Sequence, residues 1–145
     1  CDFEMNDKRY HRASPGEPQY YGVQACKWFR DYIDVLGNAG NEETGIDMRL
    51  PYCFAEHKKC MAWRIKLIAD TANLKLADSN LDATLKEIEY HSELVVNLSL
   101  KYNMNGDTSL KERIIQEING ALDLECETLL RLLDELNICM WQYLH

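Results

Sequence analysis

Apolar side chains recur every three or four residues through most of this sequence, and no other feature constrains the fold as strongly. The longest series occupies the last third of the chain and comprises Ile115, Ile118, Leu122, Cys126, Leu129, Leu133, Leu136 and Met140. A period of 3.6 residues places such a series along one face of an α-helix. No stretch has the apolar–polar alternation of a half-buried strand. The sequence therefore predicts an all-α fold, in which amphipathic helices share one core.

Turn and capping signals divide the chain into helices. The ranges that we expect to be helical are 19–37, 51–76, about 80–102, and 109 onward. Gly37 is typical of a helix end and Pro51 of a helix start. Ser109 and Glu112 form a capping box for the last segment. These signals predict a bundle of four to five amphipathic helices.

The last segment is long for a single helix. A continuous helix of about 36 residues would extend ~54 Å, whereas a compact domain of this size is about 38 Å across. The dipeptide Asn119-Gly120 favours a turn, because Gly is about 1 kcal/mol less favourable than Ala inside a helix. We therefore expect a break or a sharp bend at 119–120. Residues 19–145 would form one helical domain, and the polar residues 1–18 an extended arm.

The cysteines are spread over the whole chain. They are Cys1, Cys26, Cys53, Cys60, Cys126 and Cys139. An even, dispersed set is typical of a disulfide framework in a secreted protein. We therefore predict an extracellular, compact bundle stapled by three disulfides, with the arm tied down by Cys1. The alternative is a zinc site at Cys53, His57 and Cys60, which lie on one helix face. It would need a fourth ligand and leave the other cysteines unexplained, so we expect no metal and no cofactor.

Helical geometry limits the possible disulfides. Cys53 and Cys60 lie ~10 Å apart along one helix, whereas the Cα atoms of a disulfide lie within ~7 Å. Cys126 and Cys139 lie ~20 Å apart, so neither pair is possible. The first two helices form a hairpin that brings Cys26 level with Cys60, and a break at 119–120 turns Cys139 toward Cys53. The pairs that we expect are therefore Cys26–Cys60, Cys53–Cys139 and Cys1–Cys126.

The chain is acidic and carries no catalytic signature. Its net charge of −8 disfavours a nucleic acid or an anionic membrane as partner. No apolar run is long enough for membrane insertion. The motifs GxSxG, HExxH, GxGxxG and the P-loop are absent from the sequence. His91, with Glu87 and Glu93 close by, is expected on a solvated helix face. We therefore expect no enzymatic activity and no catalytic residues.

Aromatic residues suggest two kinds of binding site. Tyr10, Tyr20 and Tyr21 are the candidate partner surface, since Tyr is enriched in protein interfaces. The candidate lining of a hydrophobic pocket is Trp28, Tyr32, Trp63 and Trp141, for which core packing is the commoner role. We predict a secreted binding protein that acts by protein–protein contact, as a signal, an inhibitor or a host-directed effector. The alternative is an extracellular carrier of a small hydrophobic ligand in the helical core.

One sequon, Asn97-Leu98-Ser99, makes Asn97 a candidate for N-glycosylation on the polar face of its helix; the alternative is an unmodified surface Asn. At the level of class, this plan resembles secreted disulfide-bonded helical proteins such as helical cytokines and insect odorant-binding proteins. The resemblance implies an extracellular binding role. The six residues between Cys53 and Cys60 differ from the three that separate the close cysteine pair of odorant-binding proteins.

Overall fold

A computed structural model describes residues 22–37, 45–75 and 80–144 of the chain, with residues 138–144 described by their backbone alone. The helices are α1 (Val23–Val35), α2 (Arg49–Thr71), α3 (Leu81–Asn105) and α4 (Ser109–Leu144). The described residues contain no strand. The predicted all-α fold is therefore confirmed. The predicted arm of residues 1–18 lies outside the described residues.

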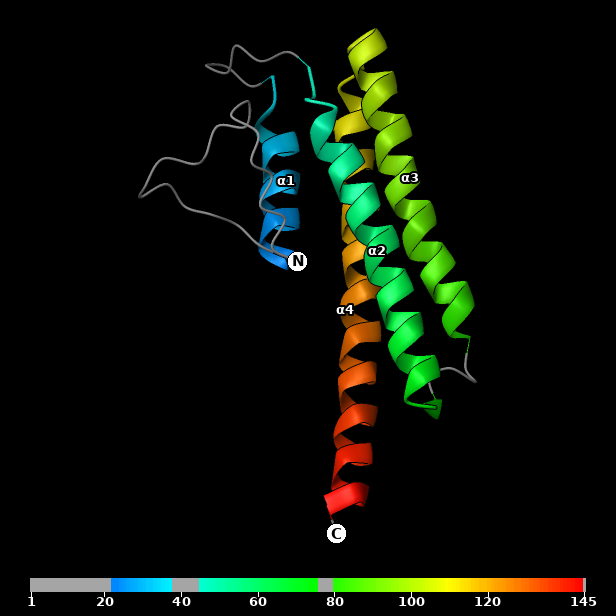
Figure 1. Cartoon of the computed structure of the whole chain (residues 1–145). Coiled ribbons are helices and arrows are strands. Elements are labelled where there is room, and N and C mark those ends of the chain that lie inside the picture. Colours follow the sequence, from blue (N-terminus) through cyan, green and yellow to red (C-terminus); the bar gives the residue numbers. More distant parts are fainter. Residues whose placement is uncertain (1–21, 38–44, 76–79, 145) are drawn as a thin grey trace, which may run out of the picture.

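The helices alternate in direction along the chain, so α4 runs parallel to α2 (Figure 1). Helix α3 packs against both α2 and α4, and α1 packs mainly against α4. Helix α1 has 13 residues and α4 has 36. As a result α1 lies beside only the N-terminal part of α4, and the C-terminal end of α4 projects past the other helices (Figure 1).

Helix α4 is continuous, and the predicted break at 119–120 is wrong. A Cβ added at Gly120 would lie 3.1 Å from Cε1 of His91 on α3, and 3.3 Å from both ring nitrogens. The imidazole is held in this position by Glu117, whose Oε2 lies 2.6 Å from Nδ1 of His91. Gly120 therefore allows a close approach of α3 to α4 instead of a turn. His91 also departs from its predicted solvated position, because it is half-buried between these helices.

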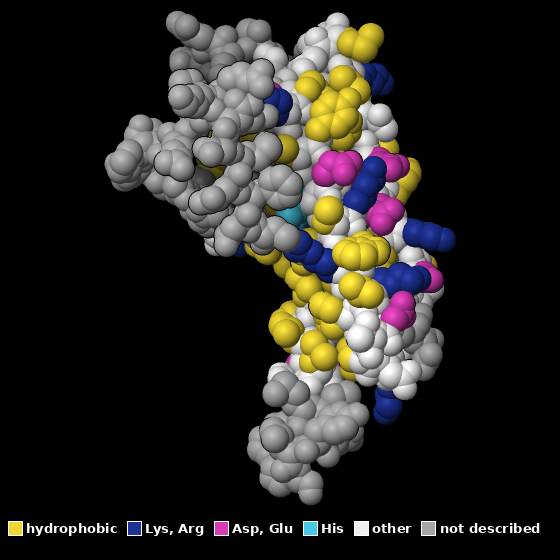
Figure 2. All heavy atoms as spheres, viewed as in Figure 1, with side chains coloured by type: hydrophobic (Ala, Val, Ile, Leu, Met, Phe, Trp, Pro, Cys, Tyr) yellow, Lys and Arg dark blue, Asp and Glu magenta, His cyan; other side chains and the backbone are white. Residues whose placement is uncertain are grey.

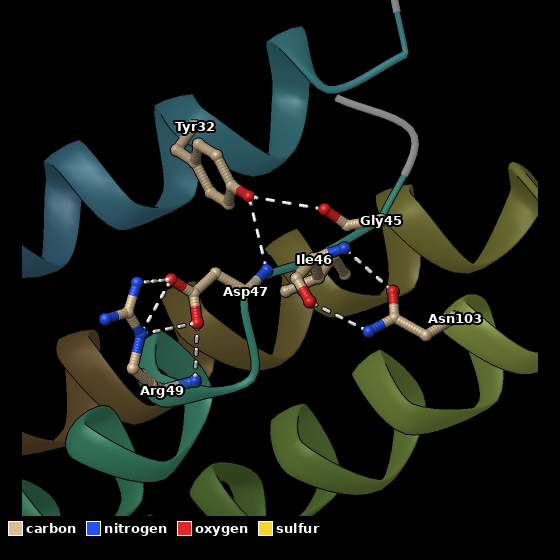
Figure 3. A network of polar contacts seen from close by, with 6 residues as sticks. All are labelled: Tyr32, Gly45, Ile46, Asp47, Arg49 and Asn103. Carbon is tan, nitrogen blue, oxygen red and sulfur yellow. Dashed lines mark hydrogen bonds and ion pairs between the residues drawn. The ribbon is translucent and has the colours of Figure 1, made fainter. Parts of the chain in front are cut away.

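The segment before α2 is fastened to α1 and α3 by side-chain hydrogen bonds (Figure 3). The amide of Asn103, near the end of α3, accepts from the Ile46 N–H at 2.7 Å and donates to the Ile46 carbonyl at 2.8 Å. The Tyr32 hydroxyl on α1 accepts from the Asp47 N–H at 3.3 Å and donates to the Gly45 carbonyl at 3.5 Å. One short segment thus joins the neighbouring ends of three helices.

The C-terminal end of α1 is anchored to α4 by Lys111. Its Nζ donates to the carbonyl oxygens of Asp34, at 2.9 Å, and Leu36, at 2.7 Å. A cation is favourable at this position because the last carbonyls of a helix carry partial negative charge. The bonds set the position of α1 along α4.

No predicted disulfide is found among the described side chains. The described cysteines Cys26, Cys53, Cys60 and Cys126 carry free thiols. Cys26 is buried in the core, whereas Cys60 is exposed on α2, so the first-choice pair Cys26–Cys60 is absent. Because α4 is unbroken and parallel to α2, Cys139 lies toward the opposite end of the bundle from Cys53 (Figure 1). Cys1 and the Cys139 side chain lie outside the described residues.

The contact between His91 and Gly120 predicts an unusual response to Gly120→Ala. Alanine favours helix by about 1 kcal/mol over glycine, but here its Cβ would press on the held imidazole. We expect Gly120→Ala to lower the free energy of unfolding in the wild-type chain. In a His91→Ala background the same substitution should raise it by about 1 kcal/mol. Urea unfolding followed by circular dichroism measures both, and an equal gain in the two backgrounds would contradict the packing role of Gly120.

Candidate functional site

A buried ion pair joins α2 to α4. The side chains of Lys58 and Glu125 expose only 1% and 4% of their surface. The Lys58 ammonium donates to Oε2 of Glu125 and lies 5.1 Å from the centroid of the Phe54 ring. Since both charges have lost most of their water, each depends on the other for compensation. The pair therefore fixes how α2 and α4 lie against each other.

The thiol of Cys26 approaches this pair from α1. Burial raises the pKa of the Cys26 thiol, and the nearby charges of Glu125 and Cys126 raise it further. The charge of Lys58 and its hydrogen bond to the thiol act in the opposite direction, without reversing the shift. A thiol with a raised pKa is mostly protonated at neutral pH and is a poor nucleophile. Cys26 is therefore a packing residue of this cluster in the described state.

His57 lies beside the same ion pair. Its pKa is lowered, chiefly by burial and then by the charge of Lys58, while Glu125 partly offsets the shift. The imidazole is therefore neutral at pH 7. Among the residues described by the structure, no three His, Cys, Asp or Glu side chains lie together as a metal site. The alternative zinc ligands Cys53, His57 and Cys60 are thus not brought together.

Two of the aromatic residues predicted to line a pocket, Trp28 and Trp63, are exposed. Trp28 stacks on Tyr32 of the same helix, with ring centroids 5.9 Å apart, and leaves 43% of its surface exposed. Trp63 on α2 is 65% exposed. Trp28 and Trp63 thus lie on different helices, and both are exposed. The remaining candidates, which lie outside the described residues or side chains, are Tyr10, Tyr20, Tyr21 and Trp141.

An apolar strip follows α2 and α4 beyond the region that α1 covers. We define the open strip as Met61 and Ile68 on α2 together with Leu129, Leu133 and Leu136 on α4. Ile68 and Leu133 are exposed, whereas Met61, Leu129 and Leu136 are half-buried. Ile68 is 41% exposed and Leu133 54% exposed, so the described residues leave a large part of both side chains uncovered. Figure 2 shows hydrophobic side chains gathered in the lower half of this face, over α2 and the adjoining part of α4. Leu133 therefore departs from the core position that its helical spacing predicted.

Comparison with known proteins finds no matching family model, no matching curated protein and no matching solved structure. Within the part of the chain that the structure describes, no helix combines the length and the apolar character needed to cross a membrane. The candidate site therefore rests on the geometry of this chain alone.

The sequence contained a signal for the ion pair that its apolar pattern obscured. Lys58 falls between Phe54 and Met61 in an otherwise apolar stripe, and Glu125 falls between Leu122 and Leu129 in another. A charged residue at a core position is rarely buried unless it is paired. Two such residues of opposite sign on separate stripes are a candidate ion pair, although their spacing along the chain does not reveal the contact.

The ion pair should be strongly cooperative. Lys58→Met leaves the Glu125 charge buried without a partner and should lower the free energy of unfolding by about 3–5 kcal/mol, as should Glu125→Leu. The double substitution should be close to wild type, because it removes both desolvated charges. Urea unfolding measures the free energy of unfolding of the wild type, the two single variants and the double variant. The exposed pair of Lys66 and Asp82 joins α2 to α3 and supplies a matched control, in which Lys66→Met should have a much smaller effect. Additive losses would show that the two charges act independently.

The cysteines should differ in reactivity. At pH 8, iodoacetamide should modify the exposed Cys53 and Cys60 at least about tenfold faster than Cys26, because alkylation requires an accessible thiolate. Raising the pH should reduce the difference in alkylation rate, because a larger fraction of the Cys26 thiol ionises. Alkylation followed by peptide mass spectrometry measures these rates. An intact mass six hydrogens below that of the reduced chain would instead restore the predicted disulfides.

Proposed function

We propose that this protein is a helical binding protein that acts by protein–protein contact, with the open strip as its contact surface. The observation that carries the proposal is that Ile68 and Leu133 are exposed although they belong to the apolar stripes that supply core residues elsewhere on α2 and α4. Contiguous apolar side chains that a folded chain leaves in water are typical of a surface that a partner covers. The strip lies on α2 and α4, the two helices that the buried pair of Lys58 and Glu125 joins, so it is held in one shape.

The predicted extracellular role, as a signal, an inhibitor or a host-directed effector, is kept as part of this proposal. Its support comes from the even cysteine count and from the sequon, whose Asn97 is exposed on α3. The free thiols of the described cysteines add no support to an extracellular location. The alternative, a carrier of a small hydrophobic ligand, is less well supported because Trp28 and Trp63 are exposed on different helices.

A photo-reactive phenylalanine analogue at Leu133 tests the proposal in the full chain. We expect it to cross-link to one partner protein in the natural surroundings of the chain. The same analogue at Met104, which is 87% exposed near the end of α3, is the matched control and should not cross-link to that protein. Ile68→Glu should weaken binding of the purified partner at least about tenfold, because a charge would enter an apolar contact.

The other outcomes of this experiment each have a defined meaning. Cross-links from Leu133 to residues 1–21 of the same molecule would show that the chain covers the strip itself. Cross-links to a second copy, with concentration-dependent sedimentation, would show a self-assembly surface. Either result would overturn a role for the strip in binding another protein.

A further inference from the structure

The open strip contains residues seven apart on two parallel helices, and Leu133, four residues after Leu129, adds to the row on α4. On α2 the row is Phe54, Met61 and Ile68, and on α4 it is Ile115, Leu122, Leu129 and Leu136. A straight α-helix drifts by only about 20° per seven residues, so each row stays on one face over this distance. Rows of this period on two helices form the seam into which a third helix packs.

Helix α1 already occupies the first part of this seam. Its buried residues are Cys26, Phe29 and Ile33, which follow one another at intervals of three and four residues along the helix. The Phe29 ring packs on the Phe54 ring, with centroids 5.8 Å apart. Helix α1 begins at Val23, and α2 and α4 continue past this end of α1 (Figure 1), as do the apolar rows in their sequences. The strip is therefore the continuation of an interface that accepts an amphipathic helix within this molecule.

We propose that the occupant of the open strip is an amphipathic helix of the partner protein, packed end to end with α1. This inference rests on the proposed binding function. The strip extends about 10 Å along each helix, since Met61 to Ile68 and Leu129 to Leu136 each span seven residues at ~1.5 Å per residue. That length matches about two helical turns, so the partner presents apolar residues at positions i, i+4 and i+7.

Two further observations narrow the chemistry of the partner. The described residues contain no strand, so they present no sheet edge to which an extended peptide could add a strand. The chain has a net charge of −8. An acidic protein attracts a basic partner over long range and raises the association rate at low salt. A basic face on the side of the partner helix that stays in water would therefore speed its association with this acidic chain.

A synthetic helix serves as the probe. The peptide carries Leu at i, i+4, i+7 and i+11 and Lys on the opposite face, and its control has the same composition in scrambled order. Calorimetric titration of the full chain should detect binding of the first peptide, with a gain of helix by circular dichroism. Ile68→Glu and Leu133→Glu should each weaken binding at least about tenfold, whereas Met104→Glu should not. Both strip residues are already exposed, so these variants should keep the wild-type circular dichroism spectrum and melting temperature.

The inference is overturned if the amphipathic peptide does not bind, if the scrambled peptide binds equally well, or if the strip variants leave its affinity unchanged. Its failure is distinguishable from failure of the proposed function. A partner protein cross-linked at Leu133 that the peptide cannot displace would leave the function in place and exclude a helical contact. Peptide binding without any cross-linked partner would instead contradict the function while showing that the strip accepts a helix.

Discussion

The arrangement of this bundle depends on the buried pair of Lys58 and Glu125. A charge pair with so little exposed surface tolerates one register, because a shift of either helix along its axis would leave both charges unpaired and desolvated. The pair therefore holds α2 and α4 parallel and at a fixed height. Phe54 and Cys26 pack around it, so the position of α1 also follows from it. The surface beyond α1 inherits its shape from the same contact.

The difference in helix length connects this core to the proposed function. Helix α1 has 13 residues, whereas α2 has 23 and α4 has 36. Helix α1 is anchored at its C-terminal end by Lys111, so it lies against the N-terminal part of α4 and, among the described residues, leaves the later part of the seam exposed. The apolar rows do not end where α1 ends. An unequal bundle of this kind exposes core-like side chains without unfolding, which is what a preformed docking surface requires.

Helix α3 holds the other side of the structure rigid through contacts that are specific in shape. The His91 ring fits against Gly120, where no Cβ intervenes, and is held there by Glu117. At the far end of α3, Asn103 binds both backbone groups of Ile46 and so fastens the segment that leads into α2. These contacts bring α3 close to both of its neighbours, α2 and α4.

The sequence by itself determined the all-α fold, since the spacing of apolar residues depends only on the period of the helix. It did not determine the role of Gly120, because that role depends on His91, which belongs to another helix. Nor did it determine which cysteines meet, because an even count carries no information about the faces on which Cys26 and Cys60 lie. Tertiary structure alone decided that Leu133 is exposed although it belongs to an apolar stripe. A stripe records which side of a helix is apolar, and only the length and position of the neighbouring helix decide how much of that side is covered.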